Sequence, residues 1–230
     1  VAGLVDPEYL DSRSALIEAD TALGTVTAGI PEGAPTAVAD GNEPEEHGTS
    51  HFAVVDADST MVSYTSTIEG AFGSGLMAGG FFLNNELTDF SRSPVVDGKL
   101  VANRVEGGKR PRSSMSPTVV WDPEGKPFLA VGAAGGSTIP VQTARAIIGA
   151  IDFQLSADEI LGLPFVMAFG DRLLLEKGTW LEDRADIFRS LGHRQVFLRE
   201  APVKGGAVLR TAAGWKAARD PRLADHIHTP

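Results

Sequence analysis

The sequence contains no cysteine, so disulfide bonds and thiolate chemistry are excluded. This absence fits a reducing cytosol or a bacterial periplasm and leaves the compartment open. Basic residues are also scarce, because 20 Lys and Arg stand against 30 Asp and Glu, for a formal net charge of -10. No basic cluster stands out beyond Lys109, Arg110 and Arg112. Nucleic-acid binding needs a larger basic surface, so we do not expect a nucleic-acid partner.

Long apolar runs are missing as well. Gly or a charged residue interrupts each run well before the roughly 20 residues that a membrane span requires, so we expect no membrane span in this chain. The start at Val1 has neither the basic segment nor the apolar core of a signal peptide, and we expect any targeting segment to lie outside this chain. The five histidines form no metal-ligand spacing and no evident catalytic triad, so no metal site is expected.

The apolar content is sufficient for a large core. A chain of 230 residues that is 43% hydrophobic is expected to form one large globular domain. Residues 1–29 include a short helix that opens at Asp6 or Pro7. Residues 30–48 carry three Pro, three Gly and five acidic residues without periodicity, which is typical of an exposed, mobile linker.

The part of the chain after residue 48 alternates between strand and helix patterns. Residues 50–56 and 61–68 predict a first hairpin, and residues 115–133 predict a second one. Further strands are expected at residues 81–85, 173–176, 195–198 and 207–209. This order favours an α+β fold in which helices cover an antiparallel sheet.

Three helices are predicted in the second half of the chain. The first spans residues 139–153, with Ser137 or Thr138 as its cap and an apolar stripe of four residues. The members of this stripe are Ala144, Ile147, Ile148 and Ile151. The second helix begins at Ser156, and the third runs from about residue 181 to 191.

Thr49 is the residue that could carry chemistry without a histidine. Taken alone, it reads as a polar residue that opens a strand. If the chain were cut before it, its hydroxyl would be the nucleophile and its own α-amine, with a pKa of about 7.7 to 8.0, would accept the proton. The exposed linker before it would make the bond between Gly48 and Thr49 accessible.

A series of motifs resembles the γ-glutamyltransferase family in order and approximate spacing. The motifs are TSHFAVVD at 49–56, TSTIEGAFGSG at 65–75, FLNNELTDFS at 82–91, KRPRSSMSPT at 109–118, GAAGGS at 132–137, LGHRQV at 191–196 and DPR at 220–222. Together they cover nearly everything from residue 49 onward.

The resemblance implies a precursor that cuts itself between Gly48 and Thr49. Residues 1–48 would then be the C-terminal tail of the large subunit with the processing linker, and residues 49–230 would be the small catalytic subunit. The implied fold is the four-layer αββα sandwich of the N-terminal-nucleophile hydrolases. The implied partner is the large subunit made from the same precursor.

The resemblance also assigns roles to individual residues. Thr67 matches a threonine whose hydroxyl assists the nucleophile, and Gly135 and Gly136 match the pair whose N–H groups form the oxyanion hole. Ser113 and Ser114 match a serine pair that holds the substrate α-carboxylate.

Glu86 and Asp89 match acidic positions that bind the substrate α-amino group. Glu69 departs from the family, because many members carry Asn there. This third carboxylate puts the usual γ-glutamyl preference in question, since clustered like charges raise one another's pKa or require a cation.

We therefore expect a self-processing γ-glutamyl transferase or hydrolase that acts on glutathione-like donors through an acyl-enzyme on Thr49. Water or an amino acid would accept the acyl group, and no metal or organic cofactor is expected. By resemblance the location would be periplasmic or secreted in a bacterium, with the cytoplasm as an alternative. Two rival functions stay open, namely a cephalosporin or glutaryl amide acylase on the same scaffold, and a catalytically inert acidic subunit.

Overall fold

The computed structural model describes residues 2–41 and 48–226. Its residues form two compact units. Unit 1 comprises residues 1–40, 95–102 and 164–201, and unit 2 comprises residues 41–94, 103–163 and 202–230. Every candidate catalytic residue lies in unit 2, so the fold of this unit decides how the site is built.

The centre of unit 2 is an antiparallel four-stranded sheet with the order β14-β13-β9-β8. Its strands are β8 (Thr118–Trp121), β9 (Pro127–Ala134), β13 (Lys204–Thr211) and β14 (Gly214–Arg219). The sequence of β9 is apolar, and six of its eight residues are buried, which suits a strand covered on both faces. Leu129, Val131, Ala207 and Leu209 from this sheet belong to the main hydrophobic core.

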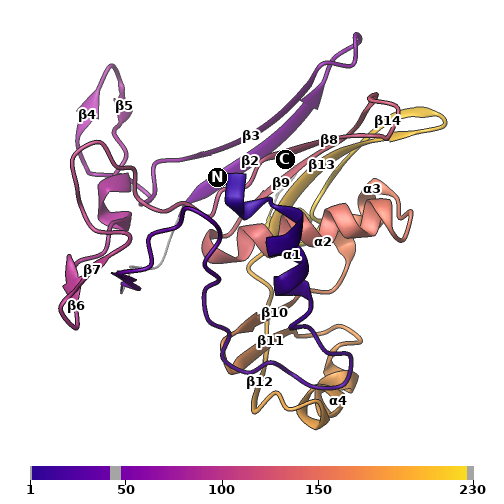
Figure 1. Cartoon of the computed structure of the whole chain (residues 1–230). Helices are drawn as coiled ribbons and strands as arrows, with labels where there is room; N and C mark the ends of the chain where they lie inside the picture. The colour runs from indigo at the N-terminus through magenta and orange to yellow at the C-terminus, as the bar shows by residue number, and fades with distance from the viewer. Residues whose placement is uncertain (1, 42–47, 227–230) are drawn as a thin grey trace. The chain divides into compact units, whose positions relative to one another are not determined.

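A second sheet consists of the predicted first hairpin, with β2 (Thr49–Val55) and β3 (Met61–Thr67). Strand β2 packs on β9 and β13, so the hairpin lies on one face of the four-stranded sheet (Figure 1). Side chains on one face of the hairpin are partly buried, whereas those on the other face, including Phe52 and Tyr64, are about half exposed. The period-two alternation in the sequence therefore determines that Thr49, His51 and Ala53 face inward.

Helices α2 (Ile139–Ile151) and α3 (Ala157–Gly162) cover the opposite face of the four-stranded sheet (Figure 1). The predicted start of α3 is confirmed, since Ser156 caps it in a capping box with Glu159. Thr138 is the N-cap of α2 as predicted, but its side chain makes no capping hydrogen bond.

The predicted apolar stripe of α2 is wrong for three of its four residues, since only Ile147 packs against the core. Ala144 is exposed, and Ile148 and Ile151 are each 49% exposed. The buried face of α2 instead carries small or polar residues, which let the helix approach its neighbours closely. They include Gln142, Thr143, Ala146, Gly149 and Ala150.

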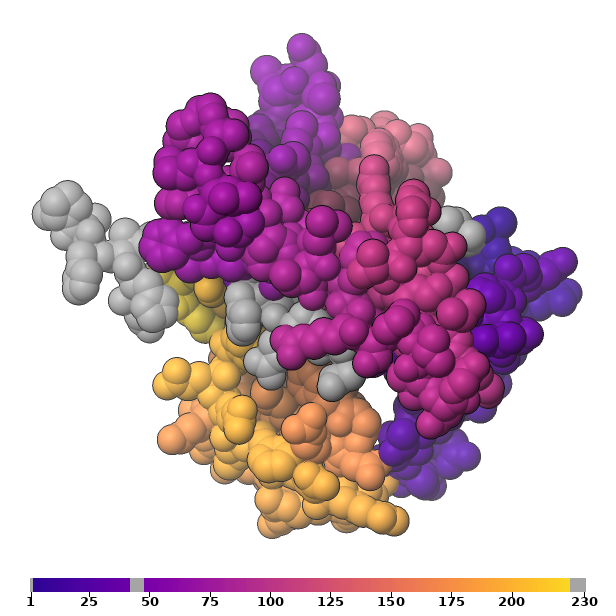
Figure 2. All heavy atoms as spheres, turned by 90° about the vertical axis from the view of Figure 1, so that its left-hand side faces the viewer, coloured from indigo at the N-terminus to yellow at the C-terminus, as the bar shows by residue number. Residues whose placement is uncertain are grey.

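Several short elements complete unit 2. They are β4 (Met77–Ala78), β5 (Phe81–Phe82), and the 3-10 helices η2 (Glu86–Asp89), η3 (Gly136–Thr138) and η5 (Pro221–His226). The strand predicted at 81–85 is therefore shorter than expected and pairs with β4. The β4–β5 hairpin lies at the surface on the side that Figure 2 shows.

Unit 1 contains short helices and two small sheets. Its helices are η1 (Ala2–Leu4), α1 (Pro7–Ser14), η4 (Glu182–Arg184) and α4 (Ala185–Ser190). Its strands are β1 (Val38–Ala39), β6 (Val95–Val96), β7 (Lys99–Val101), β10 (Val166–Phe169), β11 (Arg172–Glu176) and β12 (Gln195–Arg199). Asp6 caps α1 as predicted.

The linker prediction holds only in part. Residues 30–37 and 40–41 have no helix or strand, but Val38 and Ala39 form a strand that pairs in parallel with β7. Residues 42–47 of the predicted linker lie outside the described residues.

The α+β class is confirmed, and unit 2 shows three layers of the expected sandwich, in the order helix, sheet, sheet. None of the helices in residues 2–41 and 48–226 combines the length and apolar character that crossing a membrane would need.

Candidate active site

Thr49 and Thr67 occupy directly opposed positions of the β2–β3 ladder. Thr49 is the first residue of β2 and Thr67 is the last residue of β3, so the pair lies at one end of the hairpin. Directly opposed residues of antiparallel strands have Cβ atoms about 4.5 to 5.5 Å apart. The register thus brings together the two threonines that the sequence proposed as nucleophile and assistant.

The carbonyl group that precedes Thr49 has a defined donor. The Thr67 hydroxyl donates a 3.1 Å hydrogen bond to the Gly48 carbonyl oxygen, and it accepts a 2.8 Å hydrogen bond from the Glu69 N–H. Because the Glu69 N–H occupies a lone pair of the hydroxyl oxygen, the hydroxyl proton is left to point at Gly48. A donor on this oxygen polarises the carbonyl carbon that Thr49 would attack.

Glycine at position 48 is required by the backbone. Gly48 has a φ of +78°, and an added Cβ would lie 2.3 Å from the Glu69 carbonyl oxygen. Any side chain here would therefore push apart the two segments whose hydrogen bonds define the site.

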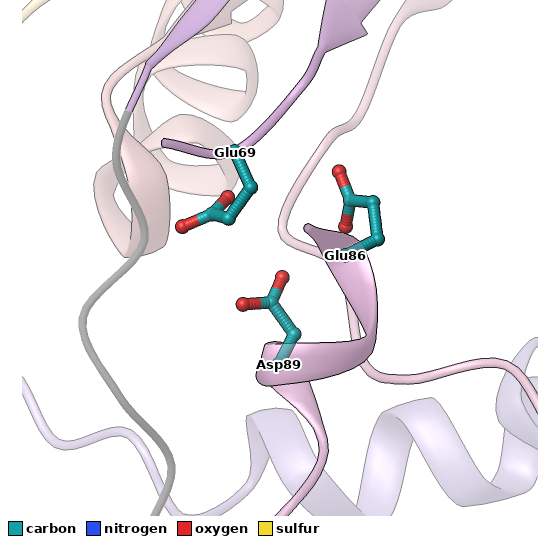
Figure 3. Close-up of side chains that lie close together, drawn as sticks. All are labelled: Glu69, Glu86 and Asp89. Atoms are coloured by element: carbon teal, nitrogen blue, oxygen red, sulfur yellow. The ribbon is translucent and has the colours of Figure 1, made fainter. Parts of the chain in front are cut away.

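Glu69, Glu86 and Asp89 form an acidic cluster beside this pair. A ligand atom from each residue lies within 4.8 Å of those from the other two, and Figure 3 shows the three carboxyl groups gathered around one space. Glu69 is 5% exposed and Asp89 is 2% exposed. The structure therefore assembles the three acidic residues that the sequence singled out.

Asn85 holds the two halves of the acidic cluster together. Its N–H donates to the Ile68 carbonyl at 3.2 Å, and its Oδ1 accepts from the Gly70 N–H at 2.8 Å. These bonds flank Glu69 on both sides. They fix the end of β3 to the start of η2, which carries Glu86 and Asp89.

Arg112 supplies positive charge next to the cluster. Asn103 connects the two, because its Nδ2 donates to the Asp89 carbonyl at 2.7 Å and its Oδ1 accepts from the Arg112 N–H at 3.0 Å. Burial raises the pKa of the Asp89 carboxyl above its usual range, and the charge of Arg112 and a hydrogen bond with Glu86 oppose this shift.

The predicted serine pair follows Arg112 directly. Ser113 is exposed, and its Oγ accepts from the Met115 N–H at 3.3 Å, whereas Ser114 is partly buried. Their role in binding a carboxylate stays a prediction.

Gly135 and Gly136 lie where β9 gives way to η3 and α2. Gly135 has a φ of +133° and Gly136 a φ of +56°, which glycine adopts without strain. The chain turns there into η3 and α2, so the positive end of the helix dipole points toward this turn. Ala134, the residue before them, lines the same cavity of about 420 Å³ as Thr49.

Gln142 fixes the turn at Gly135 and Gly136, and the sequence analysis did not identify it as a site residue. It is 4% exposed, its Nε2 donates to the Ala134 carbonyl at 2.9 Å, and its Oε1 accepts from the Lys204 N–H at 3.0 Å. Gln142 lies outside the apolar stripe predicted for this helix, so nothing in the sequence indicated that it would be buried.

His51 is a second residue that the sequence reasoning did not assign to the site. It lies on the same face of β2 as Thr49, and its Nδ1 is 2.9 Å from the Thr65 hydroxyl. Burial lowers the pKa of the His51 imidazole, which favours the neutral form. An added Cβ on Gly132 would lie 2.5 Å from His51 Cε1. Glycine at 132 thus makes the space that the ring fills between the two sheets.

Gly132→Ala is expected to destabilise the complete protein by about 1 to 3 kcal/mol, because the methyl group overpacks the space that His51 fills. The denaturant midpoint measures this loss. Gly162→Ala is the matched control, since the nearest atom to its added Cβ is 4.0 Å away. An unchanged denaturant midpoint in Gly132→Ala would contradict close packing of the His51 ring against Gly132.

The layers of unit 2, with a threonine at the first position of a strand, define an N-terminal-nucleophile hydrolase fold. A family model described as gamma-glutamyltranspeptidase matches residues 1–229. The chain therefore belongs to the gamma-glutamyltranspeptidase family, as the sequence motifs predicted.

Curated relatives and solved structures agree with this assignment. The glutathione hydrolase proenzyme of Bacillus subtilis strain 168 is 40% identical over 66% of this chain and 26% of its own length. The Escherichia coli K12 proenzyme is 36% identical over 80% of this chain and 33% of its own length. The chain thus spans about a quarter to a third of these relatives.

Among solved structures, a threonine-to-alanine mutant of Helicobacter pylori gamma-glutamyltranspeptidase gives a TM-score of 0.65 at 34% identity and covers 75% of this chain and 98% of its own. A cephalosporin acylase from Bacillus halodurans gives a TM-score of 0.74 over 96% of this chain and 38% of its own, but at 22% identity this likeness shows only the fold.

Proposed function

We propose that Thr49 is freed by cleavage of the chain between Gly48 and Thr49 and then acts as the nucleophile of a γ-glutamyl hydrolase or transferase. The observation that carries this proposal is the hydrogen bond from the Thr67 hydroxyl to the Gly48 carbonyl, directly opposite Thr49. It places a donor on the one carbonyl group that self-cleavage must activate.

Maturation begins with attack of the Thr49 Oγ on the Gly48 carbonyl carbon. The hydroxyl proton passes to the departing Thr49 nitrogen, the peptide bond breaks, and an ester joins Gly48 to the Thr49 Oγ. Water then hydrolyses this ester, which leaves a carboxylate on Gly48 and a free amine and hydroxyl on Thr49. The printed names of the relatives as proenzymes support a maturation step of this kind.

Turnover uses the same hydroxyl and the new amine. The Thr49 amine takes the hydroxyl proton as Oγ attacks the γ-amide carbonyl of the donor, and the N–H groups of Gly135 and Gly136 stabilise the oxyanion. The proton then goes to the leaving amine, and the γ-glutamyl group stays on Oγ as an ester. Water or the amino group of an amino acid resolves this ester.

Glutathione or a related γ-glutamyl amide is the proposed donor, in agreement with the names of the relatives. The large subunit from the same precursor is the proposed partner, because this chain spans only part of each relative. Ser113 and Ser114 are proposed to bind the donor α-carboxylate. A periplasmic or secreted location stays a prediction.

The substrate assignment is tested by comparing turnover of a γ-glutamyl anilide with that of a glutaryl anilide, which lacks only the amino group. The complete protein, expressed with the whole precursor, is expected to prefer the γ-glutamyl compound. A preference for the glutaryl compound would instead favour the alternative function, a cephalosporin or glutaryl amide acylase.

A further inference from the structure

His51 is an ionisable residue of the β2–β3 hairpin to which the proposed mechanism assigns no role. It lies two residues after Thr49 on the inward face of β2, which packs on β9 and β13. A Cβ added to Gly132 of β9 would lie 2.5 Å from the ring atom Cε1, and one added to Gly206 of β13 would lie 3.4 Å from Cδ2. These two glycines are directly opposed in the β9–β13 ladder. The ring therefore rests on two neighbouring strands at the one level where glycine leaves room for it.

The contact between His51 and Gly132 lies close to both parts of the proposed catalytic site. Strands rise about 3.3 Å per residue, so Thr49 is about 7 Å from His51 along β2, and Ala134 is about 7 Å from Gly132 along β9. Thr49 and Ala134 line the same cavity, so both displacements run in the same direction. Because Gly135 follows Ala134 directly, the ring of His51 sets the spacing between the nucleophile and the turn that carries the oxyanion donors.

The surroundings of the ring favour the neutral imidazole. Its Nδ1 lies 2.9 Å from the Thr65 hydroxyl, whereas its Nε2 is buried and has no hydrogen-bond partner among the described residues. An imidazolium carries a proton on both nitrogens, so protonation would leave a charged N–H in the interior without an acceptor. Burial accordingly lowers the pKa of His51.

The charged groups around His51 also oppose a further positive charge. Strands β2, β3 and β9 contain no acidic or basic residue apart from His51 itself. Lys204 of β13 and Arg219 of β14 line the same cavity as His51, and none of the described residues that line it is acidic. Arg210, the other charged residue of β13, pairs with Asp122. The strands packed against the ring thus offer it cations and no carboxylate.

We propose that His51 is a positioning residue, whose neutral ring holds Thr49 at the working distance from the Gly135 turn and whose protonation removes this alignment. This inference rests on the proposed function and adds a control of the same site by pH. Catalytic groups that are displaced by about 1 Å can lose about 10²-fold in rate. The enzyme is therefore active while His51 is neutral and loses turnover in acid, in addition to the loss that protonation of the Thr49 amine causes.

The test measures kcat for a γ-glutamyl anilide as a function of pH in the complete wild-type enzyme and in its His51→Asn variant. Below the amine pKa of about 7.7 to 8.0, a plot of log kcat against pH should have a slope of about 1, because one proton inactivates Thr49. In the wild type the slope should increase to about 2 below the pKa of His51, which burial places under the usual value of about 6.5. In His51→Asn the slope should stay at about 1, since an amide takes up no proton in this range.

The same variant tests the alignment at neutral pH. Asn can still bond the Thr65 hydroxyl but lacks the ring that rests on Gly132. The kcat of His51→Asn is therefore expected to fall at least about tenfold, with KM within about twofold of the wild-type value, because the groups proposed to bind the donor are unchanged. His193→Asn is the matched control, since it removes a histidine that stacks on Phe188 in unit 1, and it should keep the steeper acid slope.

A slope of about 2 that persists in His51→Asn, or a wild-type slope that never exceeds about 1, would overturn the inference while leaving the proposed function intact. A loss of activity that does not reverse on return to neutral pH would also overturn it, because such a loss reports unfolding. Failure of the wild-type enzyme to turn over the anilide at any pH would instead refute the proposed function. Self-cleavage of the variant precursor reports that it has folded.

Should that variant not fold, Gly132→Ala tests the same contact from the other strand. The added methyl group displaces the ring and the hairpin with it, so kcat at neutral pH is expected to fall at least about fivefold while KM changes by less than about twofold. Gly162→Ala, whose added Cβ meets no atom closer than 4.0 Å, should keep the wild-type kcat. A kcat in Gly132→Ala equal to that of the wild type would overturn the inference.

Discussion

Thr49→Ala is expected to abolish both cleavage of the chain and turnover of the donor. The substitution removes the only hydroxyl that lies on the residue freed by cleavage, and it leaves β2 otherwise unchanged. Loss of a catalytic nucleophile lowers kcat by about four to six orders of magnitude. Intact-mass analysis of the precursor and release of the aniline from the donor measure the two effects separately.

Two controls distinguish loss of the nucleophile from general damage. Thr49→Ser keeps a hydroxyl and an amine on one residue, so it should retain cleavage and turnover. Ser50→Ala changes the neighbouring exposed side chain on the other face of β2 and should leave both cleavage and turnover unchanged. Turnover by Thr49→Ala at more than a small fraction of the wild-type rate would show that the nucleophile lies elsewhere, and an uncleaved wild-type precursor would favour the inert-subunit alternative.

Thr67→Val is expected to slow self-cleavage by about 10²- to 10³-fold, which is the usual effect of removing one oxyanion donor. Valine has the shape of threonine but cannot donate to the Gly48 carbonyl at 3.1 Å. It also cannot accept from the Glu69 N–H, and an unsatisfied buried donor costs about 1 to 3 kcal/mol. The time course of precursor cleavage, followed by gel or by mass, measures the change.

Thr67→Ser restores the hydroxyl and should recover most of the cleavage rate. Thr65→Val is the matched comparison, because Thr65 faces the same side two residues earlier and its hydroxyl contacts His51 rather than Gly48. Equal cleavage rates in Thr67→Val and the wild-type precursor would contradict a role for this hydroxyl at the scissile bond.

The hairpin that holds Thr49 and Thr67 was predictable because its signals are local. Period-two alternation determines the inward face of β2, and the length of the turn determines the register that places Thr49 opposite Thr67. The proposed roles of individual residues came from the series of family motifs, because neither the alternation of residues nor the composition indicates a role. The start of α3 at Ser156 was also predictable, since its capping residues are local in the sequence, whereas β10 and β14 were not predicted.

The contacts that complete the site were not predictable, because they join distant segments. In the sequence Asn85 appeared only as the last residue of a predicted strand, yet it ties η2 to the end of β3. Gln142 lies on a helix whose apolar stripe was assigned to the wrong face, since a helical period does not tell which of two mixed faces is buried. Arg112 was read as part of a basic cluster, and only the fold places its charge near Asp89.

The most direct test of the central claim is peptide-level mass spectrometry of the complete enzyme, quenched in acid during turnover of a γ-glutamyl donor. The shorter chain should begin at Thr49, with a free α-amine and a γ-glutamyl ester on its hydroxyl. A chain that begins at another residue, or an acyl group on any other side chain, would contradict the assignment of nucleophile and base to Thr49.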